Sequence, residues 1–132
     1  MKGALGFLWQ LPQNLLGACI AVVLARAPGR IRRHGHVTIR YCFRRWGGIS
    51  LGRFVFVHVD SDDHLVRHEL GHCRQSECLG PLYLIVVGLP SIIWAMLFTF
   101  ISRRGSAPEY SWFYTERWAD SLGGLRDQSS RR

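Results

Sequence analysis

The feature that most constrains this fold is an uncharged apolar stretch at residues 81–102, PLYLIVVGLPSIIWAMLFTFIS. At about 1.5 Å per residue, a straight helix of this length reaches roughly 30 Å, enough to cross the hydrocarbon core of a bilayer. The sequence GLPS at residues 88–91 lies near its middle, and a glycine followed closely by a proline is a helix-breaking signal. The stretch therefore predicts either one span or two shorter halves that cannot cross alone.

A His-Glu-x-x-His pattern precedes this stretch, in HELGH at residues 68–72. Residues four apart lie on one face of a helix, so His68 and His72 can bind one zinc ion. Glu69 is then placed to take a proton from a zinc-activated water as a general base. Aspartates before the motif and Gly-Pro after it favour a helix with these bounds. The simpler alternative is a surface helix with two solvated histidines.

A second pair of polar residues follows the apolar stretch, in YTERWAD. Glu116 and Asp120 are four residues apart, on one face of a predicted helix. A carboxylate is the usual third zinc ligand where two histidines are present, which predicts Glu116. Asp120 is placed to hold the free N–H of a ligand histidine. His64 shares the helical face of His68 and His72, and it is the one candidate for a fourth ligand that would close the site.

The two halves of this site flank the apolar stretch. A straight span would put His68 and Glu116 on opposite sides of a membrane, where one ion cannot bind both. We therefore expect residues 81–102 to form an apolar helical hairpin, or a bend that keeps both ends on one side. The alternative is that Glu116 is not a ligand.

The pairing of His-Glu-x-x-His with Glu-x-x-x-Asp resembles the gluzincin class of zinc metallopeptidases, to which thermolysin belongs. The longer pattern, HELGHCRQS followed by TERWAD, is similar to that of small bacterial proteins, and the resemblance covers residues 62–124. It implies three ligands, a general base and a partner of a ligand histidine: His68, His72 and Glu116; Glu69; and Asp120. No residue's spacing marks it as the transition-state electrophile that those peptidases usually add; the candidates are Tyr110, Tyr114 and His64.

Residues 36–59 read as a β-hairpin. Apolar residues alternate over residues 36–46, a β-branched and aromatic run occupies residues 49–59, and Gly47-Gly48 is a turn signal between them. The resemblance implies that the second strand lines a cleft and that a bound peptide pairs with its edge; the alternative is that this strand is only part of the core.

The N-terminal residues 4–25 are also apolar, but Gln10, Pro12, Gln13 and Asn14 interrupt them. This segment is a kinked span, an interfacial helix or an uncleaved signal anchor. The basic cluster that follows it predicts a cytoplasmic location for this side by the positive-inside rule. We expect attachment to a bacterial inner membrane with the site on the cytoplasmic side.

These elements predict one α+β domain over residues 1–132. It is a minimal zincin-like unit: the N-terminal apolar segment, the β-hairpin, the His-Glu-x-x-His helix, the apolar helical hairpin and a C-terminal ligand helix. The metal-site helices occupy residues 62–124, and residues 125–132 form a disordered tail.

The net charge of +8 and the hydrophobic content of 48% together favour an anionic membrane surface as a partner. Nucleic acid is disfavoured because the basic residues are scattered, without interleaved aromatics. The four cysteines form no Cys-x-x-Cys pair, so reduced thiols are expected. The sequence predicts a membrane-associated zinc metallopeptidase that acts on a peptide or protein substrate and contacts membrane lipid. The alternative is a non-catalytic protein or interaction module in which zinc stabilises the fold.

Overall fold

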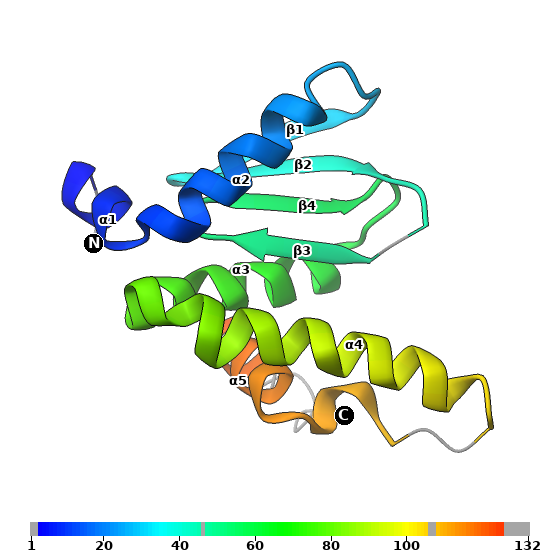
Figure 1. The fold of residues 1–132 in the computed structure, drawn as a ribbon. Helices are drawn as coiled ribbons and strands as arrows, with labels where there is room; N and C mark the ends of the chain where they lie inside the picture. The colour runs from blue at the N-terminus through cyan, green and yellow to red at the C-terminus, as the bar shows by residue number, and fades with distance from the viewer. Residues whose placement is uncertain (1–2, 46, 106–107, 126–132) are drawn as a thin grey trace.

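The computed structural model describes residues 3–45, 47–105 and 108–125, and these form an α+β fold (Figure 1). Two helices and four strands come first: α1 (Ala4–Trp9), α2 (Leu11–Val23), β1 (Arg30–His34), β2 (Val37–Phe43), β3 (Gly48–Leu51) and β4 (Phe54–His58). Then follow α3 (Asp63–Leu79), a 3-10 turn η1 (Gly80–Leu82), a π-helical turn η2 (Leu84–Gly88), α4 (Leu89–Ser102), a 3-10 turn η3 (Tyr110–Trp112) and α5 (Tyr114–Leu122).

The described strands form one mixed sheet in the order β1-β2-β4-β3. β2 pairs with β4 in parallel, while β1–β2 and β3–β4 are antiparallel. The hairpin predicted over residues 36–59 is therefore wrong, because its two halves are not antiparallel neighbours joined at Gly47-Gly48.

The physical reason is a turn that the pattern did not reveal. The run at residues 49–59 reads as one strand, but it folds back at Gly52 into β3 and β4. β4 then lies between β2 and β3, and β3 becomes an edge strand. β1 was also missed: its five residues are all exposed, so no apolar alternation marks it, and only its ladder with β2 makes it a strand.

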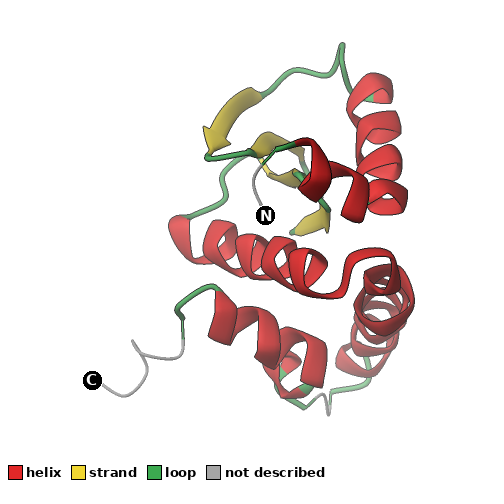
Figure 2. Ribbon diagram, turned by 90° about the vertical axis from the view of Figure 1, so that its left-hand side faces the viewer, coloured by secondary structure: helices red, strands yellow, loops and turns green. Residues whose placement is uncertain are grey.

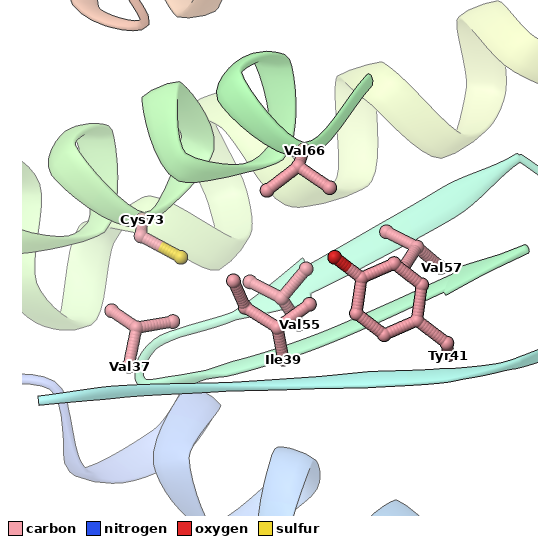
Figure 3. Close-up of a cluster of buried hydrophobic side chains, with 7 residues drawn as sticks. All are labelled: Val37, Ile39, Tyr41, Val55, Val57, Val66 and Cys73. Carbon is pink, nitrogen blue, oxygen red and sulfur yellow. The ribbon is translucent and has the colours of Figure 1, made fainter. Parts of the chain in front are cut away.

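The main core lies between the sheet and α3 (Figure 3). β2 and β4 direct alternate residues to this face, as the period of a strand requires, and α3 adds two more. The cluster consists of Val37, Ile39, Tyr41, Val55, Val57, Val66 and Cys73. Fully burying an aliphatic side chain of this size contributes about 1.5–3 kcal/mol, so this interface fixes α3 on the sheet. α3 begins at Asp62, whose carboxylate accepts the N–H of Leu65.

α3 is the central element, with the sheet on one side and α4 and α5 on the other (Figures 1 and 2). α2 covers the opposite face of the sheet, close to β3 and β4. Each metal-ligand candidate therefore lies on one of two helices that pack against each other, α3 and α5.

The apolar helical hairpin predicted at residues 81–102 is also wrong. η2 and α4 are continuous, so one helical segment runs over Leu84–Ser102. Pro90 lies in the first turn of α4, and the π-helical turn before it accommodates the missing N–H. The carbonyl of Val86, four residues before Pro90, accepts a hydrogen bond of 2.6 Å from the hydroxyl of Tyr114. The proline therefore does not separate two helices.

The bend expected within residues 81–102 is absent as well, because the chain turns back only after Ser102 and then returns along α4. Tyr110 packs its ring 5.0 Å from that of Phe98, and the indole N–H of Trp94 donates to the carbonyl of Tyr110. Of the predicted disordered tail, Leu125 is buried and donates its N–H to the carbonyl of Asp120; residues 126–132 lie outside the described residues.

Candidate metal centre

Close packing of α3 against α5 builds the site. Gly71 lies between the two ligand histidines of α3, and a Cβ atom at this position would overlap the carbonyl oxygen of Ala119 on α5. Only glycine permits this approach without moving the helices apart. The close contact brings Glu116 of α5 to the face of α3 that carries His68 and His72.

The three predicted ligands converge. One ligand atom from each of His68, His72 and Glu116 lies within 4.8 Å of the others. Oε2 of Glu116 is 3.1 Å from Nε2 of His68 and 3.6 Å from Nε2 of His72. Around a tetrahedral zinc with bonds near 2.0–2.1 Å, neighbouring donor atoms are separated by roughly 3.3 Å. The donor set and these separations therefore fit a zinc ion.

The remaining ring nitrogen of each histidine has its own partner. Nδ1 of His68 lies 2.7 Å from a carboxylate oxygen of Asp120, and Nδ1 of His72 lies 2.7 Å from the side-chain oxygen of Gln75. Because these oxygens accept hydrogen bonds, each Nδ1 donates and each Nε2 is the ring nitrogen left to face a metal ion. The structure thus places Asp120 where its spacing predicted it.

Gln75 was not assigned a role from the sequence, although it lies three residues after His72 and so on the same helical face. Its side-chain N–H also donates to the carbonyl of Thr115, at 2.8 Å. The Thr115 hydroxyl donates in turn to Oε1 of Glu116, and Ser91 of α4 donates to Thr115. This series of hydrogen bonds was not predicted from the sequence, because Ser91 was interpreted only as part of a break in the helix.

Charges at the site are strongly coupled. Burial by itself lowers the pKa of His68, but the hydrogen bond to Glu116, the charge of Glu69 and the hydrogen bond to Asp120 outweigh it and raise the pKa to about 9. Burial also lowers the pKa of His72, but the hydrogen bond to Glu116 and the charges of Glu69 and Glu116 outweigh it and raise that pKa. Burial raises the pKa of Glu116, but its hydrogen bonds to the two histidines dominate and hold it far below the usual range. Glu116 is therefore anionic, and its carboxylate lies between the two histidines.

Glu69 is buried, with 5% of its surface exposed, and lies against the edge strand β3. The hydroxyl of Ser50 lies 2.5 Å from Oε2 of Glu69. A Cβ atom at Gly48 would lie 2.5 Å from Oε1. Ser50 and Gly48 thus fix the position of this carboxylate beside the ligand histidines. Ser50 was missed because no local pattern connects it to a helix residue 19 positions away.

The other sequence candidates have different surroundings. His64 is exposed on the first turn of α3 and is outside the ligand group found among the described residues. Tyr114 is bonded to Val86, and Tyr110 packs between the rings of Trp94 and Phe98. Cys73 faces the sheet core, away from the histidines, and burial raises the pKa of its thiol strongly. The four cysteines are free.

The site belongs to a class defined by its own residues: an α+β protein in which two histidines and a carboxylate from two helices can hold a metal ion. Comparison with known proteins adds no name to this description. No family model, no curated protein and no solved structure matches the chain.

Proposed function

We propose that the protein is a zinc-dependent hydrolase that cleaves peptide bonds. The observation that carries this proposal is the buried carboxylate of Glu69, which lies next to a complete three-ligand group without belonging to it. When bound at such a site, zinc polarises a carbonyl group and lowers the pKa of a water molecule. A buried, unligated carboxylate at this point has an evident use as a general base.

The residues of the chain divide the work as follows. His68, His72 and Glu116 hold the ion, while Asp120 and Gln75 keep the two imidazole rings oriented. Glu69 accepts the proton of the attacking water and returns it to the leaving amine. Ser50 donates to Glu69 and keeps it at one position. Small exposure of the site limits bulk water, which strengthens each electrostatic interaction.

A second function is favoured by one specific observation, the depth of the site. His72 is 7% exposed and Glu116 is 2% exposed, so the ligands lie inside the α3–α5 interface rather than in an open groove. Under this alternative, zinc binds the two helices together and stabilises the fold without turnover. The two functions differ in what they require of Glu69.

The test is the isosteric change Glu69→Gln in the full chain, assayed for bound zinc and for hydrolysis of a mixed peptide library. Removal of a general base should lower the rate by about 10²–10⁴-fold, while zinc content stays near that of the parent. Glu77→Gln is the matched control, because Glu77 lies on the same helix but pairs with His36 instead. That control should keep both zinc and activity.

Three outcomes would count against the proposal. Equal rates of hydrolysis by Glu69→Gln and the parent chain would show that Glu69 is not the general base. Absence of hydrolysis in a zinc-loaded parent whose fold is lost on chelation would favour the structural role. Loss of zinc in Glu69→Gln would show that this residue holds the ion.

A further inference from the structure

The N-terminal helices α1 and α2 have an inverted distribution of polarity. Their buried residues are small or polar: Gly6, Gln10, Gln13, Asn14 and Gly17. Their exposed large residues are apolar: Leu5, Leu8, Trp9, Leu11, Leu15, Leu16, Val22 and Val23. A helix on the surface of a water-soluble domain has the opposite arrangement, with its apolar stripe toward the core.

Specific hydrogen bonds hold the polar face inward. The side chain of Gln13 donates to the hydroxyl of Ser76 at 2.9 Å and to the carbonyl of Gly80 at 2.8 Å. Ser76 donates to Gln10, and Asn14 accepts the backbone N–H of Arg53. Turning the apolar face inward would break these bonds. The buried partners, such as the Ser76 hydroxyl and the Gly80 carbonyl, would then be unsatisfied, which costs about 1–3 kcal/mol for each group. The exposed apolar face is therefore a fixed feature of this fold.

The segment Leu84–Ser102 exposes a second apolar face. It is the one helix of the described chain with the length and composition of a membrane span, and only 11% of its apolar window is buried inside the protein. The exposed residues recur at helical spacing: Ile85, Leu89, Ile92, Ile93, Met96, Leu97 and Phe100.

The path of the chain excludes a crossing by this helix. After Ser102 come the exposed residues Arg103 and Arg104, and the chain then returns to contact Trp94 and, through Tyr114, Val86. A crossing would force this return segment, whose described residues before Tyr114 form no α-helix, back through the hydrocarbon core. The exposed apolar face is compatible with a helix that lies in the plane of the membrane.

The helices α2 and α4, which carry the exposed apolar residues, lie on the same side of the molecule. α2 and α4 diverge across the front of Figure 1, and both lie on the right in Figure 2, with the sheet, α3 and α5 extending away from them. Exposed arginines follow each helix: Arg26 after α2, and Arg103 and Arg104 after α4. Trp112 and Tyr114 are exposed beside α4, and aromatic residues of this type are enriched at the membrane–water interface.

We propose that α1, α2 and α4 form one apolar layer that lies in a single leaflet of an anionic phospholipid bilayer, parallel to the membrane plane. Lipid is the occupant because two divergent helices present a broad apolar surface, which fluid acyl chains cover without a complementary shape. The flanking arginines and the net charge of +8 fit anionic headgroups. The proposal is independent of zinc and of catalysis.

The test is flotation of the full chain with preformed vesicles of phosphatidylcholine and phosphatidylglycerol. The double variant Leu89→Glu/Met96→Glu should bind at least about tenfold more weakly, because two charges enter the apolar layer. Ile31→Glu is the matched control, since Ile31 is equally exposed but lies on β1, outside the layer. That control and Glu69→Gln should both float like the parent chain, so a failed zinc proposal leaves this result unchanged.

Orientation and alternative occupants are tested on the same samples. Trypsin added outside the vesicles should cut after Arg103 or Arg104 in bound protein; protection of this site would instead indicate a helix that crosses. Equal flotation of the double variant and the parent would overturn the layer. A third outcome is that neither protein binds vesicles, while the parent chain is a dimer without lipid and the double variant is a monomer. This outcome would assign the apolar faces to contact with a second copy of the chain.

Discussion

The two faces of α3 differ in what holds them. The face toward the sheet carries Val66 and Cys73 against the valines and Ile39 of the sheet, and this cluster is apolar. The face toward α5 carries His68 and His72 against Glu116, and His72 and Glu116 are buried. One helix therefore takes part in an ordinary hydrophobic core and in a polar interface.

This difference has an energetic consequence. Hydrophobic packing needs no specific partner and contributes in proportion to the area buried. A buried polar interface is stable only when each group is satisfied, and two histidines around one buried carboxylate make the α3–α5 interface depend on their protonation or on a metal ion. We therefore expect α3 to remain on the sheet when the α5 interface is weakened. We do not expect the α3–α5 interface to survive when the packing of α3 on the sheet is weakened.

The largest expected effect is on the polar face. His72→Ala removes a ligand and should weaken zinc binding by more than about 100-fold, beyond the range usual for residues that only orient a ligand. His64→Ala is the control, because His64 is on the same helix but exposed and outside the ligand group. Isothermal titration with zinc distinguishes the two. Equal loss in both variants would mean that His64 is a ligand and that the site is closed.

A change on the apolar face should act on stability instead. Ile39→Ala leaves a cavity under α3 and should lower the free energy of unfolding by about 2–5 kcal/mol, as measured by denaturant titration in detergent. Zinc stoichiometry of the folded fraction should not change, because no ligand contacts Ile39. Loss of zinc at full retention of helix content would show that the two faces are coupled.

The smallest expected effect, taken per pH unit, is that of pH on the polar face. Zinc binds neutral histidine, and the pKa of His68 is raised to about 9 in the metal-free site, so zinc must displace a proton below that pH. Apparent zinc affinity should therefore rise with pH, by about tenfold per unit for each displaced proton, and level off above about pH 9. Glu116 adds no step in this range, because its pKa is held far below it.

The metal-free chain should show the opposite trend. The folded-state pKa of His68 is higher than its ordinary value, so its pairing with Glu116 and Asp120 stabilises the fold fully below pH 6.5 and is lost as pH rises toward 9. A chelated sample should therefore be less stable at pH 9 than at pH 6.5, as thermal unfolding would measure. Identical trends with and without zinc would contradict the assignment of His68.

The sequence by itself determined the local parts of the site. The helical period places His68 and His72 on one face, and the same rule places Glu116 and Asp120 together on α5. Ser61, Asp62 and Asp63 predict the start of α3, and in the structure Asp62 is the N-cap of the helix that begins at Asp63. These inferences needed only the spacing of residues within one helix. The α+β class was predicted separately, from the order of the expected strands and helices.

Only the tertiary structure decided the order of the strands, the path of the apolar stretch and the partners of Glu69. The sequence predicted a turn at Gly47-Gly48 and none at Gly52, and the position of the turn within the sheet depends on which strands pair. Pro90 is a break signal, but Tyr114, from a distant segment, supplies a partner for the carbonyl that it leaves free. Ser50 reaches Glu69 only because α3 packs on the edge of the sheet. Each outcome depends on contacts between segments far apart in the chain, and local propensity does not encode them.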